Sequence, residues 1–160
     1  MIVVSNTTPL SELAKVEQMH LLRDVFGEVI IPQEVYDELT RGIHPAATAV
    51  RSATWISVYS VNEDEKISQL GADTGLDLGE AAAIILAEEL GADHLLMDER
   101  AGRRVVKLRN LSVIGMVGTL LLAKQQGLIP NVKDILDDLL AQGTRISLRL
   151  YQYALTTAQE

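Results

Sequence analysis

Two acidic residues, Glu80 and Asp98, occupy positions where an α/β protein could use them for chemistry. Glu80 stands at the start of an Ala- and Leu-rich helix that ends at Gly91, and Asp98 follows His94–Met97, an apolar run typical of a buried parallel strand. A helix that leads through a tight turn into a strand runs antiparallel to that strand. We therefore expect both carboxylates at the edge of the sheet where open α/β folds hold their ligands.

Each acid also has a purely structural interpretation. Asp77 and Glu80 have the spacing of a capping box, in which two side chains close the first turn of a helix. Asp98 could be the N-cap of a helix predicted from Glu99 to Leu108. The sequence leaves both interpretations open.

Further oxygen-bearing side chains are expected at the same edge if the first, fourth and fifth strands are neighbours. These are Asn6 and Thr7 after the first strand and Glu99 beside Asp98, with Gly115 after the fifth strand. Carboxylate and amide oxygens suit a hard divalent cation such as Mg²⁺ or Mn²⁺. Zinc fits less well, because the chain has no cysteine and no pair of histidines at ligand spacing, and we expect structural roles for its three histidines.

Positive charge gathers directly after Asp98 in an otherwise acidic chain. Five of the 14 Lys and Arg residues fall between positions 100 and 109, namely Arg100, Arg103, Arg104, Lys107 and Arg109. The net charge of -8 argues against a protein that coats nucleic acid through overall charge. A local basic strip beside an acidic site would hold a phosphate backbone near a metal ion, although a solvated helix face explains the same charges.

The remaining pattern predicts one three-layer α/β domain spanning residues 1–160, with a five-stranded parallel sheet flanked by helices. Strands are predicted at Ile2–Ser5, Val29–Ile31, Trp55–Ser60, His94–Met97 and Leu111–Ile114. Helices are predicted around Leu10–Ala14 with Thr7 or Thr8 as N-cap, around Met19–Phe26, and at Gln33–Thr40, His44–Ser52, Asn62–Leu70, Met116–Gln126, Val132–Leu140 and Ile146–Ala158. Asn62 and Glu65 have capping-box spacing, and Gly71–Gly75 is expected to be a loop.

The composition favours a cytoplasmic protein. No apolar run approaches the roughly 20 residues that a bilayer span needs. The N-terminal MIVVSNTT lacks a basic leader and is expected to form a strand, and the absence of cysteine excludes disulfides.

Six segments carry a family resemblance, and they occur in the family's order along nearly the whole chain. VVSNTTPL, IPQEVYDEL, LGEAAAIILA, LLMDERAGRR, GTLLLAKQQGLI and TRISLRLY resemble the PIN-domain superfamily, most closely a prokaryotic PIN-like family of unknown function related to VapC-type toxin ribonucleases. The resemblance implies a ribonuclease that depends on Mg²⁺ or Mn²⁺. It also implies RNA as a partner, an antitoxin protein if the chain is a toxin, and a homodimer, for which Leu120–Leu122, Tyr151 and Tyr153 could be either surface or core.

The same resemblance implies the site residues. The family's acidic positions correspond to Asn6, Glu38, Glu80 and Asp98, with Glu99 as an added acid. Thr7, Arg100, Arg103 and Arg104 would then contact the nucleic acid. Idealised strand-helix geometry instead favours Glu34, nearer the start of the same helix, and Glu38 could face Arg41 three residues later.

One departure from the family pattern supports a second hypothesis. The first acidic position is normally Asp and is Asn6 here, and an amide oxygen brings no charge to a cation. The alternative is therefore a catalytically silent PIN-like module that binds RNA or a protein partner. A small-molecule phosphate enzyme or receiver-like domain fits less well, because a receiver needs an acidic pair after the first strand and a lysine after the fifth.

Overall fold

A parallel sheet forms the centre of the protein, in the computed structural model that describes residues 1–160. Its strands are β1 (Val3–Ser5), β2 (Val29–Pro32), β3 (Ile56–Tyr59), β4 (His94–Leu96) and β5 (Val113–Ile114). They lie in the order β3-β2-β1-β4-β5, and every neighbouring pair is parallel. The predicted five-stranded parallel sheet is confirmed, with β1, β4 and β5 side by side.

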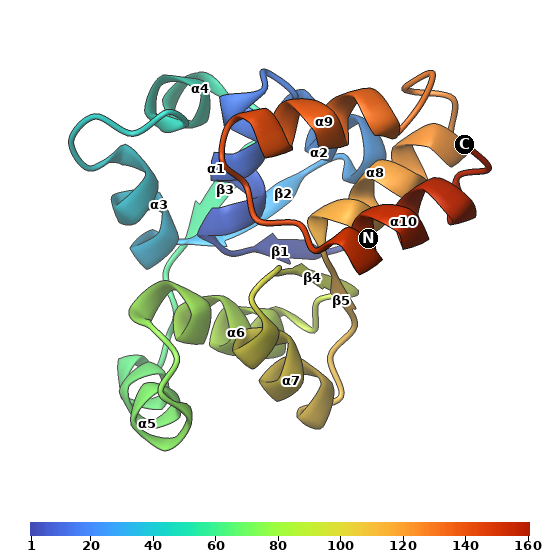
Figure 1. Ribbon diagram of the computed structural model, residues 1–160. Coiled ribbons are helices and arrows are strands. Elements are labelled where there is room, and N and C mark those ends of the chain that lie inside the picture. Colours follow the sequence, from blue (N-terminus) through green and yellow to red (C-terminus); the bar gives the residue numbers. More distant parts are fainter.

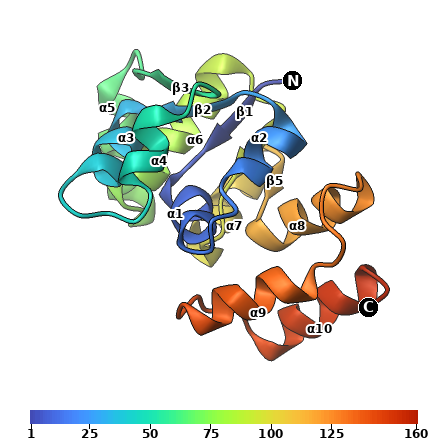
Figure 2. The same cartoon turned by 90° about the horizontal axis from the view of Figure 1, so that it is seen from above.

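Ten helices surround the sheet. They are α1 (Thr7–Lys15), α2 (His20–Phe26), α3 (Gln33–Thr40), α4 (Ala47–Ser52), α5 (Asp64–Thr74), α6 (Leu78–Leu90), α7 (Arg100–Leu108), α8 (Met116–Gln125), α9 (Lys133–Ala141) and α10 (Leu148–Thr157). Helices α5, α6 and α7 lie on one side of the sheet, and α1, α2 and α8 lie on the other (Figure 1). Helices α9 and α10 form an outer pair beyond α8 (Figure 2), so the predicted three-layer α/β fold carries an additional helical layer.

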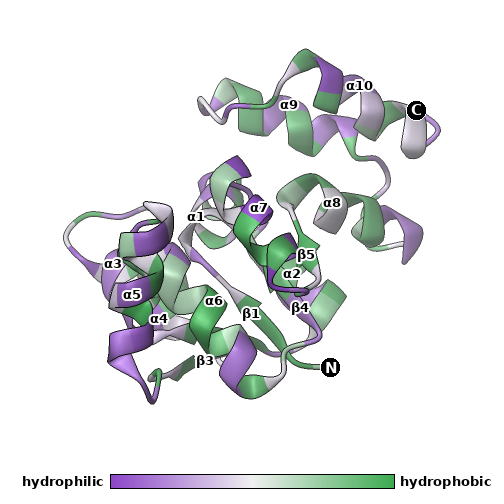
Figure 3. Ribbon diagram, turned by 90° about the horizontal axis from the view of Figure 1, so that it is seen from below, coloured by the Kyte–Doolittle hydropathy of each residue, from purple (hydrophilic) through white to green (hydrophobic).

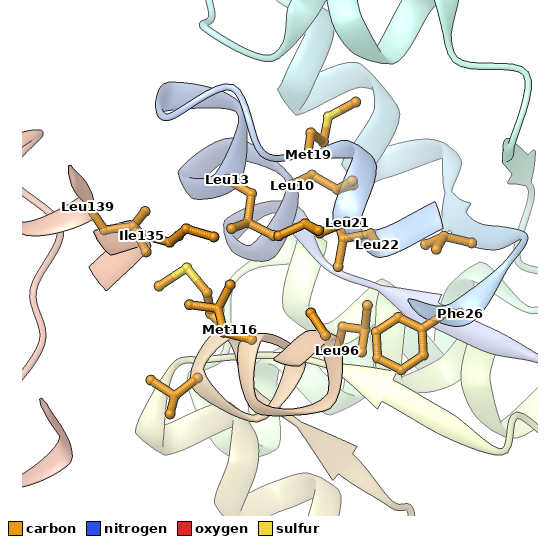
Figure 4. Packing of buried hydrophobic residues seen from close by; sticks show 14 of the residues in the cluster. Leu10, Leu13, Met19, Leu21, Leu22, Phe26, Leu96, Met116, Ile135 and Leu139 are labelled. Carbon is orange, nitrogen blue, oxygen red and sulfur yellow. The ribbon is translucent and has the colours of Figure 1, made fainter. Parts of the chain in front are cut away.

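The strand pleat divides the apolar residues between two cores. Val3 and Leu96 point into a cluster of 25 buried residues on the α1, α2 and α8 side. Val4 and Leu95, each one position away, point into a cluster of 16 buried residues on the α6 side. Figure 4 shows Leu96 on the first side, in the same packed cluster as Phe26 and Met116. Burial on both faces explains why these strands read as continuous apolar runs.

Helix α6 is enclosed more completely than the sequence predicts. Its sequence predicts one broad apolar face, with Glu88 and Glu89 left for solvent, yet every residue from Ala81 to Ala87 is buried. The reason is that α6 packs against the sheet, α5 and α3 at once, and Figure 3 shows it hydrophobic along much of its length. Glu89 is half-buried and not fully exposed, because its carboxylate accepts a hydrogen bond from the backbone N–H of Asn62, just before α5.

The start and the end of α5 both differ from the prediction. Asn62 and Glu65 form no capping box, because the backbone N–H groups of Asn62 and Glu63 donate to the Glu89 carboxylate instead. The helix also continues through Gly71 to Thr74 and ends at Gly75, which has a φ of 75°. Glycine inside a helix costs about 1 kcal/mol, and burial of Ile67 and Leu70 in the α6-side core offsets that cost.

No helix of the protein combines the length and the apolar character that a membrane crossing requires.

The central strand contacts set the stability of the sheet. Leu96 is fully buried, so Leu96→Ala should lower the free energy of unfolding by about 2–5 kcal/mol through lost transfer energy and a cavity. Leu108 is 77% exposed in α7, and Leu108→Ala should change it by less than about 0.5 kcal/mol. Urea denaturation of both variants checks this, and equal losses would contradict the placement of the core.

Candidate functional site

The ends of β1 and β4 lie side by side and begin the site. Ser5 pairs with Leu96, and the backbone N–H of Asn6 continues the ladder by donating to the Leu96 carbonyl at 3.2 Å. The residues that follow each strand, Asn6 on one and Asp98 on the other, therefore leave the sheet at the same edge. This is the edge that the sequence predicts for the site.

Asn6 is almost completely buried at this edge. Only 2% of it is exposed, and its Nδ2 donates to Glu99 Oε2 at 3.0 Å. Its Oδ1 is buried and has no hydrogen-bond partner. Asn6 is also the N-cap of α1, in place of the predicted Thr7 or Thr8, but its side chain does not cap that helix because Glu99 engages it.

Glu99 is held by residues at the start of α1. One carboxylate oxygen accepts from Asn6, and the other accepts from the Thr8 hydroxyl. Glu99 is the N-cap of α7 by backbone position, yet its side chain makes no cap hydrogen bond there. The carboxylate therefore ties α1 to α7 across the sheet edge.

Asp98 uses one oxygen to cap a helix, although not the helix that follows it. Its Oδ1 accepts from the backbone N–H of Met116 at 2.8 Å, at the start of α8, where the N-cap residue Gly115 has no side chain to do so. The prediction of Asp98 as N-cap of the next helix is thus wrong, because β4 and β5 are neighbours and bring α8 within reach. The other oxygen, Oδ2, is buried without a partner.

Arg103 lies beside Asp98 because Gly115 leaves room for it. A Cβ at Gly115 would lie 2.4 Å from Arg103 Nη1 and 3.0 Å from Asp98 Oδ1. The guanidinium also donates to the Met97 carbonyl at 3.4 Å. A positive charge is therefore fixed at the inner end of the basic helix α7.

Glu80 forms the capping box that its spacing with Asp77 predicts. Glu80 N–H donates to Asp77 Oδ1 at 2.8 Å, and Glu80 Oε1 accepts from Asp77 N–H at 3.2 Å. The second oxygen, Oε2, lies 3.2 Å from the position of a Cβ on Gly102, in the first turn of α7. Glu80 and Asp98 therefore approach the start of α7 from two directions.

Glu38 faces the same edge and does not form an ion pair with Arg41. Its Oε2 accepts from the Thr7 hydroxyl at 2.7 Å and lies 3.0 Å from the position of a Cβ on Gly79, at the start of α6. Helix α3 packs against α1 and α6, which brings its second turn to both helix starts. Glu34, which idealised geometry favours, has an Oε1 that is also buried without a partner.

Two of these carboxyls have raised pKa values. Burial raises the pKa of Asp98 from 3.8 to about 6, opposed by the Met116 N–H and Arg103 and assisted by Glu99. Burial also raises the pKa of Glu80 from 4.5 to about 7, opposed by its backbone hydrogen bond and assisted by the charges of Asp77 and Glu99. Burial is the largest cause in both acids, because desolvation disfavours the ionised form of a carboxyl group.

The donor chemistry fits a hard divalent cation. Each of Asp98 and Glu80 uses one oxygen structurally and leaves the other without a hydrogen bond, and Asn6 adds a buried, unpartnered Oδ1. Unsatisfied buried oxygens near carboxylates are suitable ligands for Mg²⁺ or Mn²⁺. No three acidic or histidine side chains converge on one point, so a bound ion would require these side chains to adjust or water to complete its shell.

A basic groove of about 850 Å³ opens from Asp98. Arg100, Arg103, Arg104 and Lys107 of α7 line one wall. The other wall is mostly apolar and is formed by residues of β5, α8 and α10, which include Val117, Leu121, Leu122, Leu150 and Tyr153. Arg109, predicted in the same basic strip, lies elsewhere and pairs with Glu88 at 2.7 Å.

Sequence reasoning missed Thr8 as a partner of Glu99 and α10 as a wall of the groove. Neither has a local signal, because both contacts join segments far apart in the chain. Two of the three histidines make local polar contacts: His94 Nδ1 lies 2.9 Å from Ser112 Oγ, and His44 Nδ1 accepts from Ala46 N–H. Of Leu120–Leu122, which the sequence allows as either surface or core, Leu120 lies in the core, whereas Leu121 and Leu122 line the groove.

Comparison with known proteins identifies one family. The model of the PIN domain family DUF3368 matches residues 2–160. No curated protein matches the chain.

The raised pKa values predict how stability depends on pH in the metal-free protein. A carboxyl whose pKa is higher folded than unfolded holds its proton longer in the folded state, so stability falls as pH rises from about 4 to about 7 through the values of Asp98 and Glu80. Asp98→Asn keeps the acceptor for Met116 N–H but cannot ionise. It should therefore stabilise the protein more at about pH 8 than at about pH 5, by about 1–2 kcal/mol.

Denaturant unfolding of both proteins at the two pH values measures that difference. Glu80→Gln, which preserves the capping box, should behave in the same direction. A stability difference that does not change with pH would show that the two carboxyls are ionised alike in the folded and unfolded chains.

Proposed function

Because the chain belongs to the PIN-domain family, we propose that it is a ribonuclease that depends on Mg²⁺ or Mn²⁺ and hydrolyses phosphodiester bonds of RNA. PIN domains in general are nuclease-like and use divalent metal ions, and they commonly bind RNA or antitoxins. The observation that carries the proposal is Asp98, whose buried and unpartnered Oδ2 stands where the acidic edge meets the basic groove.

Asp98, Glu80, Asn6, Glu99 and Glu38 are the residues that would hold the metal. When bound, the metal supplies a Lewis acid at the scissile phosphate and lowers the pKa of water. It would also satisfy the two orphan oxygens of Asn6 and Asp98. The acids contribute charge, and Asn6 contributes a neutral oxygen in a fixed position.

The basic wall would hold the RNA. Arg100, Arg104 and Lys107 lie along the groove and suit successive phosphates, since guanidinium and ammonium groups are the usual partners of a phosphate backbone. Arg103, next to Asp98, is placed to balance negative charge that develops on the reacting phosphate. Thr7 is already engaged by Glu38, so its part would be to position that acid.

The opposite wall suits either bases or a partner protein. Tyr153 is 58% exposed and borders the groove, and an exposed ring can stack on a base of single-stranded RNA. Leu148 is 71% exposed on the same helix, α10. An apolar helix of this kind also suits the predicted homodimer or an antitoxin, which would apply if the chain is a toxin.

RNA cleavage tests the metal site. The protein should cleave RNA with Mn²⁺ or Mg²⁺, and both Asp98→Asn and Glu80→Gln should lower the rate by at least about 100-fold, since loss even of a group that supports a metal ligand costs about 10–100-fold. Both variants keep their helix-capping hydrogen bonds, so a loss of activity would not reflect unfolding.

Asp138→Asn, an exposed site on α9, is the matched control and should retain full activity. Cleavage by Asp98→Asn at the native rate would trace the activity to something other than this edge.

RNA binding without added divalent ions tests the groove. Arg104→Ala and Lys107→Ala should each weaken binding of single-stranded RNA several-fold and lower the slope of log K against log salt by about 1, whatever the sequence. Arg145→Ala removes an exposed arginine outside the groove and should leave both quantities unchanged. Filter binding over a series of salt concentrations provides the measurement, and equal effects of all three substitutions would exclude a specific groove.

A second candidate function is a catalytically silent module that binds RNA or a protein partner. It is favoured by the lack of three convergent acidic ligands and by the neutral Asn6. Salt-dependent RNA binding with no cleavage under either metal would support this candidate over the nuclease.

A further inference from the structure

We infer that Asn6 and Glu99 act as one unit, in which Glu99 supplies the negative charge that an acid after β1 would otherwise bring to the metal site. The inference rests on the proposed function, because it concerns the charge that faces a bound cation. On this inference Asn6 contributes a neutral oxygen and Glu99 contributes the charge, so the two residues together replace a single aspartate after β1.

The hydrogen bonds determine how the Asn6 amide is turned. Glu99 as a carboxylate can only accept, so the group facing its Oε2 at 3.0 Å must be the Asn6 NH₂. The Asn6 oxygen is thereby directed away from Glu99, and it remains buried and unpartnered in a residue only 2% exposed. A buried oxygen without a hydrogen-bond donor is a suitable ligand for a bound cation.

The surroundings leave room for one negative charge and not for two. Aspartate at position 6 would place a carboxylate oxygen about 3 Å from Glu99 Oε2, where the Asn6 NH₂ now lies. Two carboxylates at that distance in a partly buried place repel each other, which destabilises the folded chain. Asn6 and Thr8 instead give Glu99 a hydrogen-bond donor on each carboxylate oxygen.

The total charge at the edge is consequently preserved. A cation near Asp98 Oδ2 would meet the neutral oxygen of Asn6 and the charge of Glu99, which sits directly after Asp98. An arrangement with aspartate at position 6 and a neutral residue at 99 has the same charge. Arg103, the positive side chain next to Asp98, faces the edge from α7 in both cases.

A charge swap tests this pair. In the double variant Asn6→Asp/Glu99→Gln, the new amide at position 99 can donate to the new carboxylate at position 6 and still accept from Thr8. Calorimetric titration with Mn²⁺ alone, without RNA, should show that Glu99→Gln weakens binding by about 10-fold or more. The double variant should return the affinity to within about 3-fold of the native protein, while Glu65→Gln, an exposed glutamate on α5, should change nothing.

Thermal unfolding without metal gives a second readout. Asn6→Asp alone should lower the melting temperature by at least about 2–4 °C, because it places two carboxylates together, and the double variant should recover most of that loss. A structural tie that carries no metal charge would show the same recovery of stability but no change in Mn²⁺ affinity on Glu99→Gln.

Three results would overturn the inference. Native-like Mn²⁺ affinity of Glu99→Gln would reduce Glu99 to a link between α1 and α7. A double variant no better than Glu99→Gln would show that the two positions do not exchange charge. Failure of the native protein itself to bind Mn²⁺ would overturn the metal part of the proposed function as well, whereas the first two results leave that function intact.

Discussion

The burial of acidic oxygens where the parallel strands end is the constraint on which the rest of the structure depends. Asp98, Glu80 and Glu99 each need hydrogen-bond donors there, and the fold provides donors for only some of their oxygens. The donors come from the starts of α8, α6 and α1, so satisfying the acids also fixes where three helices begin. The same shortage leaves the oxygens that a cation would need.

Structural roles and the proposed chemical roles would therefore be shared within single side chains. Asp98 caps α8 with Oδ1 and leaves Oδ2 free, and Glu80 closes a capping box with Oε1 while Oε2 lies near the start of α7. The capping interpretation and the site interpretation of the sequence are compatible, because a carboxylate has two oxygens. Alanine at either position would remove a helix cap together with a charge, whereas the amides Asn and Gln separate the two effects.

The electrostatics of the molecule are local and opposed to its overall charge. A chain with a net charge of -8 presents Arg100, Arg104 and Lys107 along one groove that leads to the acidic edge. A polyanion would thus be repelled by most of the surface and attracted to this groove, which favours one orientation of binding. The glycines at the junction, Gly102 and Gly115, make room for Met97, Glu80 and Arg103 to pack there.

Local signals suffice to predict the five strands, most helix limits, the capping box of α6 and the edge at which Glu80 and Asp98 lie, because periodicity, glycine ends and cap spacing can be read from neighbouring residues. The family resemblance predicted Glu38 as a further acidic residue at that edge. Tertiary structure alone decided that Asn6 pairs with Glu99, that Asp98 caps α8, that Glu89 replaces a capping box at α5 and that α10 walls the groove. These contacts join residues far apart in the chain, and a donor or acceptor takes whichever partner the packing of helices on the sheet brings within about 3 Å.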